Sequence, residues 1–407
     1  MAMIDIAAGA AVTADVATPR SKPGLLNKPF LPSLAARIGA WLTARLGCVI
    51  RVGDTVIVAR HADVREVLER DLDFCIGPIN AARIDEVNGP FILGMDRGHV
   101  LDHERSALYR AFHQVDMGAL RDQVQAEAKR RIAAVRNRTI DAVGEFARPI
   151  AAQTAVALFG VSGPSEQLLM DVARAIFAHT FLNIDDDEVI RKRAVAAGVM
   201  MHDWIAAEIA RRLTLPDPGH DLMGELIRLQ QPGAVDAELV RRTLGGMLVG
   251  AIDTTATCVA KIIAVLGRDR ALAAQVARDV DQPDRLRGWC WEALRRWPHN
   301  PVLLRQAAAA TTLNGQEIRQ GDRIFAWTQA AMLDATVFPD PARLRPDRPM
   351  GNYLHFGGAL HACAGRVVNG FQIPILVGEL VRQGIVSVGK MAWAGPFPDE
   401  LPVVLAR

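Results

Sequence analysis

Ten residues near the carboxyl-terminal end of the chain, FGGALHACAG at 356–365, place one cysteine where it could hold a metal. Cys363 precedes an apolar stretch that predicts a helix. A thiol at a helix N-terminus meets the positive end of the helix dipole and free backbone N–H groups, which favour the thiolate. Gly357, Gly358 and Gly365 let the backbone approach a flat ligand closely. A metal thiolate is one interpretation of this loop, and an ordinary buried thiol is the other.

Cys363 has no partner cysteine that would complete a familiar metal or disulfide motif. The chain contains five widely spread cysteines, at Cys48, Cys75, Cys258, Cys290 and Cys363. An odd and sparse set of this kind disfavours a secreted disulfide scaffold and indicates a reducing compartment. No second cysteine stands at zinc-finger spacing and no C-x-x-C-H sequence is present, which disfavours a zinc site and covalently attached haem.

An acid and an alcohol, Asp253 and Thr254, interrupt the apolar stretch LVGAIDTTAT at 248–257. The pattern predicts a helix from about Asp236 to Leu266, which would be roughly 45 Å long at 1.5 Å per residue. Asp and Thr compete with the backbone for hydrogen bonds and lower helix propensity. A solvated helix face is the ordinary explanation, but the apolar neighbours leave little room for one. The pair is therefore a candidate functional position.

Two further segments carry charged residues at recognisable spacings. WEALRRWP at 291–298 places Glu292 and Arg295 three residues apart, and a later segment runs from Asp340-Pro341 to Arg348. A Glu and an Arg at this helical spacing most often form a surface pair that contributes a fraction of a kcal/mol. The spacing alone therefore assigns no function.

The four motifs together resemble those of the cytochrome P450 superfamily. Its haem-binding signature, F-G-x-G-x-H-x-C-x-G, is matched by Phe356, Gly357, His361, Cys363 and Gly365, with Ala359 in place of the second glycine. The family's E-x-x-R motif and D-P-x-x-F-x-x-x-R segment precede this signature in the right order, with Leu344 in place of the phenylalanine. The resemblance covers about residues 40 to 407 and is strongest from residue 236 onward.

The resemblance implies that the chain binds haem b non-covalently and that the Cys363 thiolate is the axial ligand of its iron. It places the basic partners of the haem propionates at Arg305, His361 and His103, because buried carboxylates need such partners. Ala107 stands where the family has a further arginine. Four more residues would lie beside the haem, namely Phe356, Gly357, Gly250 and Ala251.

The resemblance also implies roles for the other motif residues. Thr254 would hydrogen-bond dioxygen and its water at the haem, and Asp253 would relay protons from solvent. A buried network of Glu292, Arg295 and Arg348 would support the cysteine loop and take no part in the chemistry. Substrate contacts would come from the segment Ile79 to Leu93 and from Phe177, Phe181, Ala251, Val302 and Leu303.

The fold that positions these residues is predicted to be mainly α-helical with small β-sheets, an α+β arrangement. Residues 49–59 alternate around a Gly-Asp turn and predict a hairpin, and an Asn-Gly turn at 314–315 predicts a second β region with a strand at 322–327. From about residue 117 to 267 the pattern is helical. Breaks at 160–164, 215–219 and 231–233 delimit separate helices.

We expect one large helical domain around the haem at residues 25–407, after a flexible segment at 1–24. No repeat, low-complexity linker or shift of composition marks a domain boundary. The chain departs from the family at Met332-Leu333 and at Gly370. Pro374 should kink or shorten the last helix.

The composition is that of a soluble globular protein. Of the 407 residues, 50% are hydrophobic and 23% are charged, which allows a large core. The formal net charge of +2 removes the main reason to expect attraction to nucleic acid or to anionic membranes. The most apolar stretch contains Asp253 and Lys261, so it predicts a buried core helix and not a membrane span. We expect a cytoplasmic monomer without a signal peptide.

These inferences favour a haem-thiolate monooxygenase that inserts one oxygen atom of dioxygen into a hydrophobic small molecule. Its electrons would come from an external ferredoxin or flavodoxin-type donor with a reductase, because the sequence has no flavin or iron–sulfur motif. Two alternatives retain the haem: a peroxide-driven peroxygenase, against which the Asp253-Thr254 pair argues, and a haem-binding sensor or carrier. In a third, Cys363 binds nothing. Terpenoid, steroid, aromatic, fatty-acid and natural-product substrates all remain open.

Overall fold

A computed structural model describes Val16, Ala17, Arg20, Ser21, Ile38 and residues 49–406 apart from Ile184 and 231–234. Most of the segment predicted to be flexible, 1–24, lies outside the described residues, as do Cys48 and the break predicted at 231–233. Within that segment, Arg20–Ser21 forms a short strand (β1).

Helices form most of the described chain, as the sequence predicts. The α-helices are α3 (His61–Glu69), α4 (Gly77–Asn88), α5 (His99–Phe112), α6 (Met117–Ala133), α7 (Arg148–Phe159), α8 (Glu166–Phe177), α9 (Glu188–Leu213), α10 (Leu222–Arg228), α11 (Ala237–Arg268), α12 (Arg270–Arg278), α13 (Pro283–Arg296), α14 (Thr328–Ala331) and α15 (Arg366–Arg382). Short helical turns are η2 (Ile92–Gly94), η3 (Ala142–Ala147), η4 (Ala178–Leu182), η5 (Met350–Asn352) and η6 (Ala359–His361). The breaks predicted at 160–164 and 215–219 separate α7 from α8 and α9 from α10, so both are confirmed.

Acidic or hydroxyl side chains cap the amino-terminal ends of six helices, including the two longest, α9 and α11. Each of these N-cap side chains accepts a hydrogen bond from a backbone N–H of the first turn: Asp116 of α6, Ser165 of α8, Asp187 of α9, Asp221 of α10, Asp236 of α11 and Asp269 of α12. Such a cap satisfies an otherwise unpaired donor and contributes about 1 kcal/mol. Asp236 therefore sets the start of α11 within one residue of the predicted position.

The strands form four small sheets. A five-stranded sheet has the order β2 (Ile50–Val52), β3 (Thr55–Val58), β9 (Arg323–Ala326), β6 (Leu303–Ala307) and β4 (Phe74–Cys75). The hairpin of β7 (Thr311–Leu313) and β8 (Gln316–Ile318) stands apart from it. Both predicted hairpins are confirmed, with β2 antiparallel to β3 and β7 antiparallel to β8. The parallel pairing of β3 with β9 joins the two predicted β regions.

Two three-stranded sheets near the carboxyl terminus were not predicted. One has the order β10 (Ile385–Val388), β13 (Pro402–Leu405) and β5 (Thr139–Asp141). The other has the order β1, β11 (Ala392–Ala394) and β12 (Phe397–Glu400). Their strands have two to four residues, too few to show a clear alternation in the sequence.

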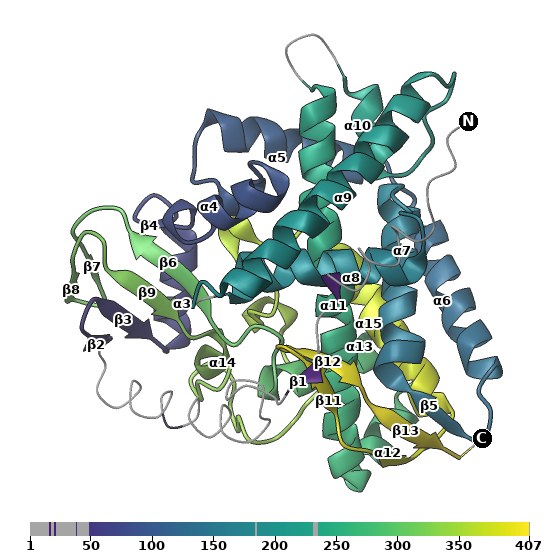
Figure 1. Ribbon diagram of the computed structural model, residues 1–407. Coiled ribbons are helices and arrows are strands. Elements are labelled where there is room, and N and C mark those ends of the chain that lie inside the picture. Colours follow the sequence, from purple (N-terminus) through teal and green to yellow (C-terminus); the bar gives the residue numbers. More distant parts are fainter. Residues whose placement is uncertain are drawn as a thin grey trace.

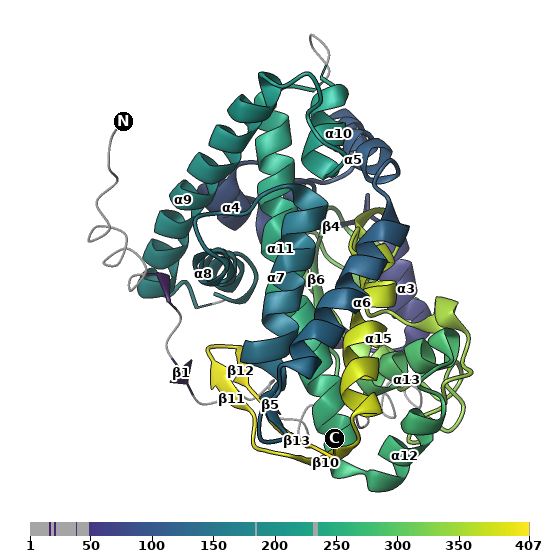
Figure 2. The same ribbon diagram turned by 90° about the vertical axis from the view of Figure 1, so that its right-hand side faces the viewer.

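Helix α11 passes through the interior of the protein (Figures 1 and 2). It contributes side chains to two apolar cores. Its amino-terminal half, up to Ile252, packs in one apolar cluster with α7, α8 and α9, and its second half, from Ala256, packs in another with α13 and α15. Asp253, Thr254 and Thr255 occupy the junction between these clusters. The polar residues of α11 therefore lie where its packing partners change.

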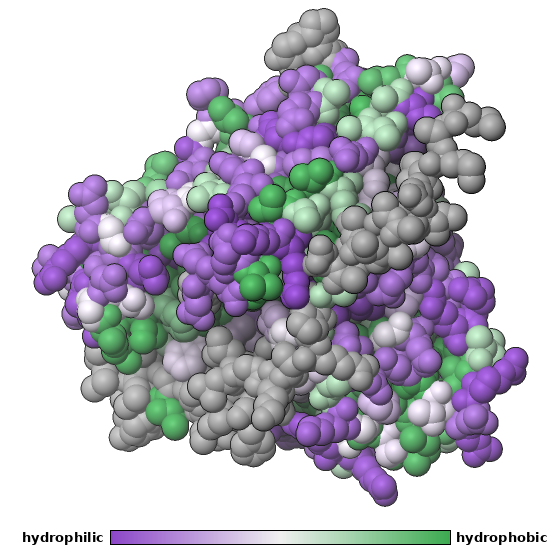
Figure 3. Space-filling view, viewed as in Figure 1, coloured by the Kyte–Doolittle hydropathy of each residue, from purple (hydrophilic) through white to green (hydrophobic). Residues whose placement is uncertain are grey.

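The predicted core helix is confirmed in α11. This helix is long and apolar enough to cross a membrane, but 72% of its most apolar window is buried inside the protein. Phe91 packs so closely on the helix that a Cβ at Gly246 would lie 2.5 Å from ring atoms. The outer face shown in Figure 3 is largely hydrophilic, with hydrophobic residues in small groups.

Pro374 does not shorten the last helix, contrary to that part of the prediction, because α15 continues through it to Arg382. A proline inside a helix removes one backbone donor, here the partner of the Gly370 carbonyl. The second half of α15 compensates through packing, since Ile373, Leu376 and Leu380 are fully buried.

Candidate active site

The cysteine loop is closed by its own backbone. The Cys363 N–H donates to the Phe356 carbonyl (2.9 Å), and Gly357 takes a positive φ of 67° that favours glycine. The Cys363 side chain is exposed. Burial nevertheless raises the pKa of its thiol, against the backbone N–H groups of Gly365 and Arg366, which lower it. The Cys363 sulfur is thus accessible although protein atoms surround it.

Ala359, which departs from the family signature, also has a positive φ, at 51°. Left-handed backbone costs an alanine roughly 1–2 kcal/mol relative to right-handed backbone. The loop therefore keeps its shape at this position without the glycine, at an energetic cost that the surrounding structure must offset. The departure changes the stability of the loop and leaves the position of Cys363 intact.

Two of the three predicted propionate partners lie near each other. Arg305 is on β6 and is buried, its guanidinium donates to the carbonyl of the neighbouring Leu304 (2.8 Å), and no ion pair to it is found among the described residues. Burial lowers the pKa of Arg305 to about 10. Burial, reinforced by the charge of Arg305, lowers the pKa of His361 to about 4. A buried cation without a carboxylate bond is suited to an anionic group.

His103 differs from these two because its side chain is exposed on α5. Arg105, two residues later on α5, acts electrostatically on His361 instead. Sequence reasoning did not single out Arg105, whose guanidinium also lies over the ring of Tyr109, 4.6 Å from its centroid. It is an additional basic residue on this side of the site.

Asp253 is enclosed by two arginines from other helices. Its Oδ1 accepts hydrogen bonds from Arg148 Nε of α7 (2.9 Å) and from Arg174 Nε and Nη2 of α8 (2.9 and 2.7 Å). Burial alone would raise the pKa of Asp253, but the charges of Arg148 and Arg174 outweigh it and lower the pKa. Within the described part of the chain, Asp253 Oδ2 is buried and has no hydrogen-bond partner.

The residue after the acid–alcohol pair is hydrogen-bonded to the first turn of α15, which directly follows the cysteine loop. Thr254 Oγ1 donates to the Gly250 carbonyl (2.6 Å), and Thr255 Oγ1 hydrogen-bonds Asn369 Oδ1 (3.0 Å). A Cβ at Gly365 would lie 3.7 Å from Asn369 Nδ2 and 3.6 Å from Cys363 Sγ. The middle of α11 and the cysteine loop therefore face each other across the first turn of α15.

The structure brings Glu292, Arg295 and Arg348 together as expected. Arg295 Nε and Nη2 donate to Glu292 Oε1 (2.7 Å) and Oε2 (2.9 Å), and Arg348 Nε donates to Oε2 (3.2 Å). Both members of the first pair are completely buried. Tyr353 and the Arg345 backbone N–H, which sequence reasoning missed, complete the network by donating to Glu292.

The predicted substrate residues form an aromatic cluster and a second, separate group. The Phe177 ring lies 4.8 Å from Phe181, 5.5 Å from Phe397 and 6.0 Å from His299, measured between centroids. Leu303 lies on β6, where its Cδ1 would be 3.6 Å from a Cβ at Gly357. Ala251 and Val302 are partly exposed. Phe397 and His299 join the cluster only through tertiary contacts, which no sequence pattern indicated.

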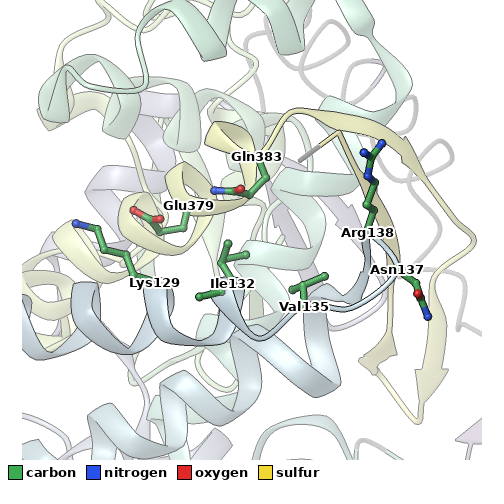
Figure 4. Close-up of a pocket in the computed structure, with 8 residues that line it drawn as sticks. Lys129, Ile132, Val135, Asn137, Arg138, Glu379 and Gln383 are labelled. Atoms are coloured by element: carbon green, nitrogen blue, oxygen red, sulfur yellow. The ribbon is translucent and has the colours of Figure 1, made fainter.

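A surface pocket of about 530 Å³ lies elsewhere, between α6 and α15 (Figure 4). Its lining includes Lys129, Ile132, Arg138 and Glu379 and none of the motif residues. This pocket is not the candidate active site, because none of its lining residues belongs to the cysteine loop or to the Asp253-Thr254 pair. Among the described residues, no cluster of three or more His, Cys, Asp or Glu side chains could hold a metal ion by itself.

Comparisons with known proteins agree with this geometry. The family model described as cytochrome P450 matches residues 44–383. Mycinamicin IV hydroxylase/epoxidase of Micromonospora griseorubida is 28% identical over 86% of this chain and 89% of its own length. Cyclomarin C epoxidase CymV of Salinispora arenicola is 28% identical over 64% of this chain, which spans 65% of that relative. The crystal structure of CalO2 matches 95% of this chain and 99% of its own at a TM-score of 0.82 and 20% identity.

The chain belongs to the cytochrome P450 family. Its enzyme class is that of the P450 monooxygenases, which carry haem b on a cysteine thiolate. The residues present fit this group. Cys363 offers a single accessible sulfur, Arg305 offers a buried cation without an ion pair among the described residues, and a Cβ at Gly250 would meet nothing within 4 Å.

Several residues of the site were not singled out from the sequence. Arg148, Arg174 and Asn369 approach the motifs from other helices. A signal exists for the two arginines, because each stands within an otherwise apolar helical face, and a buried arginine needs a partner. The identity of that partner is a property of the tertiary structure.

Proposed function

We propose that the protein is a monooxygenase that inserts one oxygen atom of dioxygen into a hydrophobic small molecule, with electrons from an external ferredoxin or flavodoxin-type donor and its reductase. The observation that carries this proposal is the hydrogen bond between Thr255, the residue after the Asp253-Thr254 pair, and Asn369, which lies in the first turn of α15 directly after the Cys363 loop. We further propose a single domain over residues 25–407, acting as a cytoplasmic monomer.

In the proposed site each residue has a separate task. Cys363 would hold the haem iron, and Arg305 and His361 would pair with the propionates. The bound haem supplies the activation of dioxygen, which a thiolate ligand favours. Thr254 offers a hydroxyl on the exposed side of α11, where it can hydrogen-bond a small molecule or a water.

Asp253 is suited to moving protons because it is ionised and incompletely bonded. Its lowered pKa keeps the carboxylate charged at neutral pH, and its Oδ2 is left without a partner in the described structure. A carboxylate oxygen of this kind can accept a proton from water and pass it to Thr254, the next residue along α11. The arginines hold the carboxylate by Oδ1 alone and leave the other oxygen for this exchange.

The aromatic cluster favours an apolar substrate. Phe177, Phe181 and Phe397 present ring surface at mutual distances typical of aromatic packing. The relatives named above are described as acting on mycinamicin IV and cyclomarin C, which supports a natural-product substrate as one class to test. The substrate itself is the open part of the proposal.

The first test is spectroscopic. Purified protein, reduced and exposed to carbon monoxide, should show the Soret band of a thiolate-ligated haem. Cys363→Ser should lose that band, whereas Cys258→Ser should keep it. An unchanged spectrum in Cys363→Ser, or purified protein without haem, would show that the assignment of the ligand is wrong.

The second test separates the proposed monooxygenase from its alternatives. A panel with one steroid, one terpenoid, one fatty acid, one aromatic and one macrolide is screened for the spectral shift of substrate binding. Hits are incubated with a surrogate ferredoxin, its reductase and NADPH, or with hydrogen peroxide alone. We expect product in the first incubation and a loss of product in Thr254→Ala. Product from peroxide alone would favour a peroxygenase, and binding without product in both incubations would favour a sensor or carrier.

A further inference from the structure

Five of the six residues that connect α13 to β6, Trp297–Pro301, form a turn whose carbonyls are held by side chains. Two of the five are prolines, which have no N–H and cannot pair in a regular element. On one side, Thr328 Oγ1 donates to the carbonyls of Asn300 (3.2 Å) and Pro301 (2.9 Å). The Gln329 N–H also donates to the Pro301 carbonyl (3.0 Å). Helix α14 therefore fixes the end of the turn.

On the other side, Lys261 of α11 fixes its beginning. The Lys261 ammonium donates to the Pro298 carbonyl (2.7 Å) and lies 5.4 Å from the centroid of the Trp297 ring. The residue is only 2% exposed. None of the ion pairs found among the described residues includes it, so its charge is compensated by a carbonyl dipole and a ring face.

A lysine in this position is costly. Moving an ammonium group out of water is unfavourable unless a counter-charge accompanies it, and burial lowers the pKa of Lys261 to about 8. A neutral residue of similar volume would pack in the same apolar surroundings without that cost. The charge is therefore not explained by the stability of the fold, and its two contacts both belong to the turn.

The turn carries residues of the candidate active site. His299 contacts the aromatic cluster through Phe177, and in the described structure its buried Nε2 has no hydrogen-bond partner. Leu303 and Arg305 follow at the start of β6. A displacement of the turn away from α11 would therefore move one wall of the substrate region and a proposed propionate partner together.

We propose that Lys261 is a positioning residue of the active site, whose ammonium holds the Trp297–Pro301 turn against α11 and so places His299, Leu303 and Arg305. This inference rests on the function proposed above for the site. Lys261 acts through the turn and contacts no substrate. Ligands large enough to touch the wall depend on Lys261, and ligands that reach only the iron do not.

Other titratable or charged groups face Lys261 or its contacts, on α11, on α13 and in the turn itself. They are Cys258 and Arg268 of α11, Cys290 of α13, His299 of the turn and, beyond His299, Asp253. Burial raises the pKa of Cys258 to about 12 and that of Cys290 further, and it lowers the pKa of His299 to about 3. The arginines beside Asp253 lower its pKa, so it stays ionised. Between pH 7 and 10, Lys261 is thus the group in this set whose charge changes.

The test compares two azoles that bind the haem iron in the same way but differ in size. Holoenzyme is titrated with 1-methylimidazole and with 1-phenylimidazole, and the Soret shift gives each Kd. In Lys261→Met we expect the Kd of 1-phenylimidazole to rise at least about fivefold, while that of 1-methylimidazole stays within about twofold. Thr328→Val, which releases the other side of the turn, should act in the same direction. Ile263→Val, a core truncation on the same helix, should change neither Kd.

A pH series on the wild type provides a second readout, with affinities referred to the neutral azole. Lys261 is protonated below about pH 8, so 1-phenylimidazole should bind more weakly as the pH rises from 7 to 10. Lys261→Met should give a flat profile over the same range. Equal changes for the two azoles, no change for either, or a pH profile shared by wild type and variant would overturn the proposal. Wild-type protein without a thiolate-type Soret band would instead reject the proposed function, and this inference with it.

Discussion

Two buried clusters of the protein have the same composition, one carboxylate and two arginines, but differ in how completely they are bonded. Both oxygens of Glu292 are used, by Arg295, Arg348, Tyr353 and a backbone N–H. Asp253 is held by Oδ1 alone, and its buried Oδ2 has no partner among the described residues. A saturated network rigidifies its surroundings, whereas an unsaturated one keeps a polar atom available.

The arginines of the two clusters differ in the same sense. Arg295 and Arg348 also donate to backbone carbonyls in the segment 332–343, which ties that segment to α13. Arg174 and Arg148 also donate to backbone carbonyls, those of Pro398 and Met170, but each has a second carboxylate beside it: Asp399 lies 2.9 Å from Arg174, and Asp171 lies 3.6 Å from Arg148. Each arginine of the Asp253 cluster is therefore shared between two carboxylates, whereas Arg295 and Arg348 pair with Glu292 alone among the described residues. The Glu292 cluster is thus suited to supporting the cysteine loop, and the Asp253 cluster is suited to exchanging protons.

The largest effect is expected from breaking the saturated cluster. Glu292→Gln leaves two buried guanidinium groups without a counter-charge, which should cost about 3–5 kcal/mol in the apparent free energy of unfolding. This cost is measured by denaturation in guanidinium chloride and by the yield of haem-loaded protein. Glu69→Gln, which removes the exposed partner of Arg65, should cost less than about 1 kcal/mol. A similar cost for both variants would contradict the supporting role of the buried Glu292 cluster.

Lys261 differs from both clusters because it is a buried charge with no carboxylate partner among the described residues. Its pKa of about 8 in the folded protein lies below its value of 10.5 in an unfolded chain. The ammonium is therefore destabilising below pH 8, and this penalty disappears as the pH rises toward 10.5. The stability of the wild type relative to Lys261→Met should thus increase by about 3 kcal/mol from pH 7.5 to 10.5. Paired denaturation curves at these pH values test it, and a constant difference would contradict it.

A smaller loss of stability but a large loss of activity is expected when the unsaturated cluster is broken. Asp253→Asn keeps the shape and removes the charge. Arg148 and Arg174 retain other partners, so the cost should be about 1–3 kcal/mol. Turnover of a substrate identified by the screen should fall by about 100-fold, with the thiolate-type Soret band unchanged. The control is Asp171→Asn, which touches Arg148 but not the site, and should keep turnover within about twofold. A stability loss as large as that of Glu292→Gln would erase the difference between the clusters.

The smallest effect is expected at the edge of the saturated network. Tyr353→Phe removes the hydroxyl that donates to Glu292 Oε1 (2.8 Å). Glu292 keeps its other donors, so the loss should be about 1 kcal/mol, with activity unchanged. Denaturation curves measure this loss of stability. The control is Tyr109→Phe, the same change in the chain's other tyrosine. A loss of more than about 3 kcal/mol would mean that the network is less redundant than its bonds suggest.

The two clusters also differ in how far the sequence predicts them. Glu292 and Arg295 lie three residues apart on one helix, so their contact follows from helical spacing. The partners of Asp253 stand 105 and 79 residues before it in the chain. Local pattern cannot specify which of 47 basic residues will reach a given acid, because that depends on how three helices cross.

The same limit applies to the strands and the loop. The two hairpins with Gly-Asp and Asn-Gly turns were predicted, since a tight turn has its own residue signature. Strand β6, which carries Arg305, was missed because it pairs with β9 and β4 over long distances and has no local turn. The shape of the cysteine loop at Ala359 was also hidden, because an alanine gives no sign that its φ is positive.

The proline within α15 has a mechanical consequence for the cysteine that precedes this helix. Without an N–H at Pro374, one link is missing between the turn that follows Cys363 and the half of the helix anchored in the core. Helices bend most easily at such points. The turn that follows Cys363 can therefore tilt against the part of α15 where Ile373, Leu376 and Leu380 are fully buried more easily than it could on a helix with every backbone bond in place.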